Sequence, residues 1–205
     1  MTCGGPTPGQ DAAAGAAQRG FAATVPGGAD RPTVGVVPFD RRPWPDPVGP
    51  GQESVWDYPR PPRAERVPRR AELWHGGTLV AASDDLVRVL ETSHPPTWYL
   101  PRTAFTDGVL VPGEHRTFCE WKGVAHYCDV RVPGVPPLTD VAWWYPRPDA
   151  RYPELTDRVA VYVAPFERIT LDGETVRPQP GGFYGGWVTD EVVGPFKGGP
   201  GSRGW

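Results

Sequence analysis

Lysine, cysteine and long apolar runs are all scarce in this sequence. Its 205 residues include three cysteines and only two lysines, Lys122 and Lys197, among 21 basic residues. So few cysteines do not form a disulfide framework, and we expect a reducing, cytoplasmic location. No apolar run approaches the length of about 18 residues that a membrane span needs. Residues 1–30 show no secretory signal, so we expect no membrane partner.

An excess of charge of one sign is also missing. The formal net charge is -3, which argues against nucleic acid as a partner. No dinucleotide fingerprint, P-loop, flavin motif or haem-binding cysteine pair occurs, so we expect no cofactor. No Cys-x-x-Cys pair is present, and we expect no metal. The preference for arginine over lysine, with abundant alanine, glycine and proline, indicates a GC-rich bacterial gene.

Glycine and proline are abundant but unevenly spread. They number 26 and 28, and 11 of the prolines lie between Pro26 and Pro68. Residues 1–50 have no periodic apolar pattern and bury too little to offset their ordering entropy. We therefore expect a disordered or loosely docked N-terminal arm over 1–50 and one domain over 51–205. Five arginines in Arg60–Arg70 indicate a solvated extended strand, or a strip that holds an anion.

From residue 71 onward the pattern is typical of short strands. Gly76-Gly77, Lys122-Gly123 and Asp172-Gly173 each predict a two-residue hairpin turn between two strands. Further strands are expected at Leu86–Glu91, Thr97–Leu100, Val141–Tyr145 and Val159–Val163. Helical signals are limited to short turns near Pro101–Phe105 and Pro153–Asp157. The sequence predicts a mainly β fold, a compact sandwich or barrel-like single domain of short antiparallel strands with few short helices.

The C-terminal segment combines glycine with aromatic residues. Gly181–Trp205 holds nine glycines among 25 residues, interleaved with Phe183, Tyr184, Trp187 and Phe196. Flexible spacers between aromatic anchors favour a strap, from about residue 178, that lies over the domain and closes a pocket.

Several runs in order along the chain resemble one family. They are Leu90–Pro101 (LETSHPPTWYLP), Thr117–Tyr127 (TFCEWKGVAHY) and Ala142–Pro148 (AWWYPRP), and together they resemble the DUF427 family. Arg177–Trp187 and Gly194–Gly201 resemble the C-terminal extension of its actinobacterial members. The resemblance covers roughly residues 54–205 and implies a compact, mainly β domain. The nucleotidyltransferase label sometimes attached to this family is not carried over, because no Gly-Ser followed by Asp-x-Asp occurs here.

The hairpin around Lys122-Gly123 concentrates reactive side chains. A two-residue turn would pair Cys119 with His126 and place Cys119, Trp121, His126 and Cys128 on one face. Such a face would suit a thiol nucleophile with its base, or the start of a zinc site. Buried packing of small polar groups is the third interpretation.

Two turns supply a candidate acid–base set. The Pro95-Pro96 turn would aim Glu91 and His94 toward the mouth of the domain, with Tyr99 on the next strand. Lys122 and Tyr127 would give a proton or hold an oxyanion, and Glu91 or His94 would take one. The catalytic candidates are therefore Glu91, His94, Tyr99, Lys122 and Tyr127. Alternatively, Glu91 pairs with Arg88 or Arg102, and Lys122 is a solvent-facing turn residue.

Aromatic residues would complete a pocket or simply form the core. The substrate-binding candidates are Trp98, Cys119, Trp121, Trp143 and Tyr145. The favoured hypothesis is a cofactor-independent enzyme of lyase, isomerase or cyclase type, acting on a small organic molecule in bacterial secondary metabolism. The alternative is a non-catalytic module that binds a small molecule or a peptide.

Overall fold

The computed structural model describes residues 43–202 and 205, which belong to one unit, Phe39–Trp205. The N-terminal arm predicted for residues 1–50 lies outside the described residues up to position 42. Within the described part, no helix is long and apolar enough to cross a lipid bilayer.

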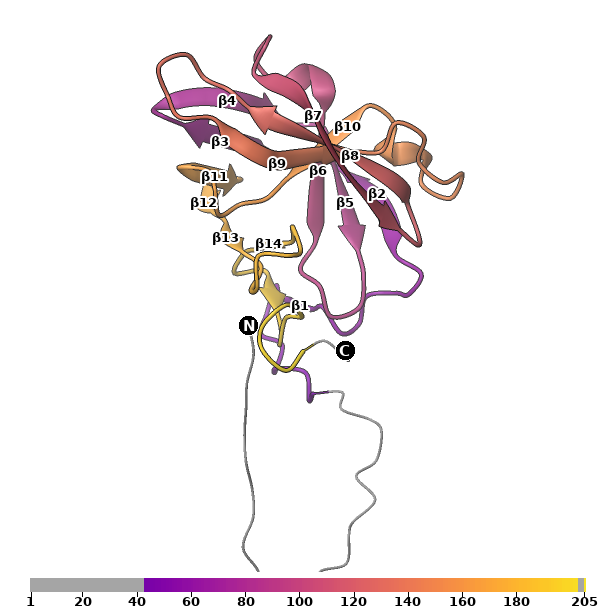
Figure 1. The fold of residues 1–205 in the computed structure, drawn as a ribbon. Helices are drawn as coiled ribbons and strands as arrows, with labels where there is room; N and C mark the ends of the chain where they lie inside the picture. Colours follow the sequence, from indigo (N-terminus) through magenta and orange to yellow (C-terminus); the bar gives the residue numbers. More distant parts are fainter. Residues whose placement is uncertain (1–42, 203–204) are drawn as a thin grey trace, which may run out of the picture. The chain divides into compact units, whose positions relative to one another are not determined.

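The regular secondary structure of the described chain is almost all strand (Figure 1). A seven-stranded sheet has the order β2 (Arg63–Val67), β5 (Leu86–Leu90), β6 (Thr97–Pro101), β10 (Arg158–Val161), β9 (Leu138–Trp144), β8 (Gly123–Val130) and β7 (Leu110–Cys119). A four-stranded sheet has the order β12 (Glu174–Thr175), β11 (Arg168–Leu171), β3 (Ala71–His75) and β4 (Thr78–Ser83). Two short ladders pair β1 (Glu53–Ser54) with β15 (Val192–Val193), and β13 (Arg177–Pro178) with β14 (Trp187–Val188). The described helices are two 3-10 turns, η1 (Arg102–Ala104) and η2 (Pro153–Leu155).

All strand pairs of the two large sheets are antiparallel, which confirms the predicted mainly β class. Two of the three predicted hairpins have the expected two-residue turns. Gly76 and Gly77 have φ of 57° and 71°, and Asp172 and Gly173 have φ of 49° and 85°. Positive φ at both central residues is the type I′ geometry whose twist matches that of paired strands.

The third hairpin differs from the prediction. Cys119 pairs with Gly123 and Thr117 with Ala125, so Glu120–Lys122 form a three-residue loop. Gly123, at φ 97°, takes up the left-handed backbone at the end of that loop. The predicted pairing of Cys119 with His126 is therefore wrong.

The observed register changes which side chains of this hairpin share a face. Cys119 now shares a face with Tyr127, while Cys128 lies in the core on the opposite face. His126 pairs with Arg116, one position out of phase with Tyr127, and so also faces away from Cys119. The interpretations as a Cys119–His126 nucleophile pair and as a zinc site are both wrong, because these side chains point to opposite faces.

The two faces of the seven-stranded sheet have different partners. One face packs against the four-stranded sheet, where residues such as Leu73 and Val80 meet Leu100 and Val161 in a shared core. The other face carries a second cluster of buried side chains that is rich in aromatic rings: Val87, Val89, Tyr99, Ala125, Tyr127, Trp143, Tyr145, Tyr152, Leu155 and Ala160. The candidate site lies on this aromatic face.

The arginine-rich segment forms β2 and its flanks. Every arginine in it contacts at least one carboxylate: Arg60 with Glu91 and Glu120, Arg63 with Glu65, Arg66 with Asp85, Arg69 with Asp172 and Glu191, and Arg70 with Glu72 and Asp84. These partners neutralise the segment. The segment is an extended strand, as the first interpretation predicted. Because its arginines already have carboxylate partners, they do not favour a continuous anion-holding strip.

The segment after β12 contributes to both faces of the seven-stranded sheet, with Trp187 in the core between the two large sheets and Gly185 on the aromatic face. Trp187 of β14 is fully buried, and its indole Nε1 donates to the carbonyl of Val161 at 3.4 Å. Gly185 lies so close to the ring of Trp143 that a Cβ there would stand 2.1 Å from it. Residues 179–186, called the strap loop below, are thereby held against the seven-stranded sheet.

Candidate functional site

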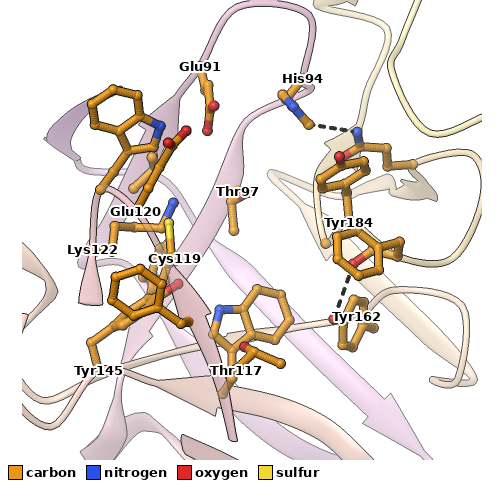
Figure 2. Close-up of a pocket in the computed structure, with 18 of the residues that line it drawn as sticks. Glu91, His94, Thr97, Thr117, Cys119, Glu120, Lys122, Tyr145, Tyr162 and Tyr184 are labelled. Carbon is orange, nitrogen blue, oxygen red and sulfur yellow. Dashed lines mark hydrogen bonds between the residues drawn. The ribbon is translucent and has the colours of Figure 1, made fainter. Parts of the chain in front are cut away.

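The aromatic face contains a cavity of about 310 Å³, within the usual size range of ligand pockets. Figure 2 shows Glu91, Glu120 and Lys122 on one side of the view, with His94, Tyr184 and Tyr162 on the other. The lining residues are Arg60, Val89, Glu91, His94, Thr97, Tyr99, Thr117, Phe118, Cys119, Glu120, Trp121, Lys122, Tyr127, Trp143, Tyr145, Tyr162, Gln179, Phe183, Tyr184, Gly185 and Lys197.

The cavity brings together all but one of the catalytic and substrate-binding candidates predicted from the sequence. Those that line it are Glu91, His94, Tyr99, Cys119, Trp121, Lys122, Tyr127, Trp143 and Tyr145. The exception is Trp98, which is buried between the two large sheets and packs near Trp187. The prediction that Trp98 lines the binding wall is wrong. Side chains alternate along β6, so Tyr99 faces the cavity and Trp98 faces the core.

Glu91 is held at the cavity by the turn that follows β5. The main-chain N–H of His94 donates to the carbonyl of Glu91 at 3.0 Å, and that of Ser93 donates to Val55 at 2.9 Å. Ser93 has a φ of 70°, in the left-handed region that L-residues seldom adopt. Two prolines follow the turn, so the backbone that carries Glu91 is held on both sides.

The Glu91 carboxylate is shielded but only loosely paired. Its side chain is 19% exposed, and the nearest cation is Arg60, at 4.0 Å. The same arginine is closer to Glu120, at 3.4 Å. The predicted alternative partners are otherwise engaged, since Arg88 pairs with Glu53 and Glu65 and Arg102 lies over the ring of Trp144. The alternative pairing of Glu91 with either arginine is therefore wrong.

Lys122 is half-buried at the end of the three-residue loop and lines the cavity. Among residues 43–202 and 205, no carboxylate forms an ion pair with its amine. An ammonium group without an anion beside it is available to a ligand. A carboxylate and an amine thus reach the same cavity from two separate turns.

His94 is held in one tautomer by Gln179. The amide oxygen of Gln179 accepts from the N–H of Gly186 at 3.0 Å, and its nitrogen donates to the carbonyl of Lys197 at 2.7 Å. That nitrogen also donates to Nδ1 of His94, at 3.0 Å. Because Nδ1 accepts, the proton of the neutral ring lies on Nε2. His94 therefore presents a donor, which favours Glu91 as the base of the acid–base set.

The surroundings of His94 keep its ring neutral. Burial, with the positive charges of Lys197, Lys122 and Arg60, lowers the pKa of His94 to about 3. Tyr184 packs edge-on against the ring, with centroids 4.5 Å apart. A ring that resists protonation serves as a hydrogen-bond donor throughout the physiological range.

This lowered pKa predicts a pH-dependent stability. The unfolded chain protonates His94 near pH 6.5 and the folded chain near pH 3, so stability is complete above pH 6.5 and is lost as the pH falls. Between pH 7.5 and 5 we expect His94 alone to remove about 2 kcal/mol of unfolding free energy. Urea titrations of the wild type and of His94→Asn would measure it as the difference between their pH slopes. Equal slopes for the two proteins would contradict the prediction.

Several tyrosine hydroxyls line the cavity and are further hydrogen-bond donors. The hydroxyl of Tyr127 lies 3.2 Å from that of Thr117, and Tyr162 donates to the carbonyl of Phe183 at 3.3 Å. The Tyr99 hydroxyl is buried and makes no hydrogen bond of normal geometry, although Trp143 and Tyr145 lie near it. Burial raises the pKa of Tyr99 above its usual value, so the hydroxyl stays protonated.

Among the lining residues that the sequence reasoning did not place at the site are Tyr162, Gln179 and Lys197. Lys197 is the second of the only two lysines, and that rarity was an available signal. Its amine donates to the main-chain oxygen of Trp205, and burial lowers its pKa. Nothing in the sequence pattern linked Gln179 to His94, because their contact depends on how the strap loop packs.

No group of three or more His, Cys, Asp or Glu side chains in the described residues is placed to hold a metal ion. Cys119 is a free, half-buried thiol at the cavity, and Cys128 is a free thiol in the core. The polar side chains that line the described cavity are two carboxylates, three cations and several neutral hydrogen-bond donors.

Comparison with known families shows what the chain is similar to. A sequence model described as a domain of unknown function (DUF427) matches residues 63–173, more than half of the chain. No curated protein matches. The matched range includes Glu91, His94 and Lys122, while Arg60 and the cavity residues from Gln179 onward lie outside it.

Proposed function

The chain belongs to the DUF427 family of unknown function, and from its cavity we propose a cofactor-independent enzyme that moves protons on an organic substrate. The observation that carries this proposal is a loosely paired carboxylate, Glu91, and an unpaired amine, Lys122, on one aromatic-walled cavity. Dehydration, isomerisation, addition and cyclisation are the reactions that such side chains perform without a cofactor. A tailoring step in actinobacterial secondary metabolism is the setting that we propose.

The proposed mechanism begins with Glu91 as base. Its carboxylate takes a proton from a carbon next to a substrate carbonyl. The C–H electron pair forms a carbon–carbon double bond, and the carbonyl π electrons move onto the carbonyl oxygen. Lys122 and Tyr127 stabilise the resulting oxyanion, and the Nε2–H of His94 adds a neutral donor. Glu91 then returns the proton to another atom, or a leaving group departs and takes it up. Atoms and electrons balance without any added oxidant or reductant.

The walls would strengthen these interactions by excluding water. Trp143 packs between two rings, with its centroid 4.7 Å from Tyr162 and 6.3 Å from Tyr127. Electrostatic interactions are stronger in such an apolar enclosure than in water. Ring surfaces would also orient a planar substrate over the acid–base groups.

Hydrogen exchange tests the proposal even while the substrate is unidentified. A metabolite extract from a GC-rich actinobacterium is incubated in D2O with the protein, and mass spectrometry identifies compounds that gain deuterium. We expect Lys122→Met and Tyr127→Phe each to lower the initial labelling rate by about tenfold or more. Arg131→Met, an exposed cation away from the cavity, is the control. Full labelling by Lys122→Met, Tyr127→Phe and Glu91→Gln would overturn the proposal.

A binding module is the second candidate. It is favoured by the number of neutral donors on the wall, since His94 and Tyr99 both keep their protons over a wide pH range. Compounds from the same extract would then raise the melting temperature without gaining deuterium. Labelling that depends on Glu91 would exclude this alternative.

A further inference from the structure

Two buried donors on the cavity wall lack a hydrogen bond of normal geometry. The Trp121 indole Nε1 is buried without a hydrogen-bond partner among the described residues, and the buried Tyr99 hydroxyl makes no hydrogen bond of normal geometry, although Trp143 and Tyr145 lie near it. Tyr99 as a whole is fully buried. Buried polar groups are nearly always satisfied, and each exception calls for an explanation. A ligand oxygen in the cavity would satisfy them, so the wall favours a molecule rich in acceptors.

The charges on the wall favour an anion. Arg60, Lys122 and Lys197 contribute three positive charges, and Glu91 and Glu120 two negative ones, which leaves one net positive charge. Besides burial, which has the largest effect, all three cations lower the pKa of His94, so their positive charges act together on the strap side of the cavity.

The remaining surface favours a flat, apolar body. Trp143 contacts the rings of Tyr127 and Tyr162, which are tilted from it by 32° and 45°. Aromatic ligands bind such surfaces through offset or edge contacts. A volume of about 310 Å³ accommodates one or two rings.

We infer that the ligand of this cavity is an aromatic carboxylic acid, its ring against Trp143 and its carboxylate beside Lys122 and Tyr99. This inference rests on the proposed function, because it names the substrate class of the same cavity. Lys122 has no carboxylate of its own, so a ligand carboxylate would supply its counter-ion. Arg60, by contrast, already lies between two glutamates.

Matched acids and amides test the inference directly. Benzoate and naphthoate are titrated against benzamide and naphthamide by calorimetry, using full-length protein. A charge-assisted hydrogen bond predicts that each acid binds about tenfold more tightly than its amide. Lys122→Met should abolish that preference, and Arg131→Met, the exposed control, should preserve it. Glu91→Gln should strengthen acid binding severalfold, because it removes a negative charge from the wall.

The outcomes separate this inference from the proposed function. Equal binding of acids and amides, or no binding of either, overturns the carboxylate class, whatever the labelling experiment shows. A preference for acids that Lys122→Met leaves intact overturns the assigned position. A preference for acids without Glu91-dependent deuterium labelling supports the carboxylate class while the acid–base function fails.

Discussion

Replacing Glu91 with glutamine is expected to lower the rate of substrate proton exchange by about a hundred- to ten-thousand-fold, the usual contribution of a general base. Glutamine keeps the size and shape of the side chain but does not accept a proton at neutral pH. The carboxylate that it replaces is shielded and loosely paired, so the substitution leaves no tightly bound cation without its partner. The measurement is the initial rate of deuterium incorporation, with the melting temperature recorded alongside.

Glu120→Gln is a matched control for this experiment. Glu120 lines the same cavity and contacts the same arginine, yet its side chain is 62% exposed against 19% for Glu91. A water-exposed carboxylate is screened and easily replaced, so we expect its loss to change the rate only slightly. Equal losses from both substitutions would show a general charge effect and would contradict the role of Glu91 as base.

Replacing Trp187 with alanine is expected to destabilise the protein by about 3–5 kcal/mol, the usual cost of truncating a buried tryptophan. Trp187 is fully buried, and its ring centroid lies 6.3 Å from that of Trp98. Alanine would leave a cavity in the core between the two large sheets, directly after the strap loop, and the Val161 carbonyl would lose its indole donor. Denaturant unfolding followed by circular dichroism would measure the change.

Trp44→Ala provides the comparison for Trp187→Ala. Trp44 is 92% exposed, and substitutions at such positions change stability by less than about 0.5 kcal/mol. The Trp187 substitution should also loosen the strap loop and with it Tyr184, which packs on His94. Similar unfolding midpoints for the two variants would contradict the idea that Trp187 anchors this loop.

The sequence predicted the strands well where turn chemistry was unambiguous. Gly76-Gly77 and Asp172-Gly173 adopt positive φ at both positions, which closes a two-residue turn and sets the register. At Lys122-Gly123 the same signal was misleading, because only Gly123 has positive φ and the loop begins earlier, at Glu120. A register error of this kind moves side chains to the other face, so the Cys119–His126 pair did not form.

The sequence predicted those parts of the candidate site whose position depends on neighbouring residues in the chain. Glu91 and His94 belong to one turn and Lys122 to another, and both turns carry visible proline or glycine signals. Trp98 and Tyr99 are equally aromatic neighbours, and the strand's phase alone decides which one faces the cavity. The contacts of Gln179 join segments 85 residues apart, and no local pattern encodes them.

The single amide of Gln179 connects His94, Gly186 and Lys197. Any outward swing of the strap loop that breaks these bonds exposes the imidazole to water and restores its normal basicity. Opening of the cavity and protonation of the His94 ring are therefore coupled. Mild acid should therefore favour the open form, and a bound acid molecule should hold it shut.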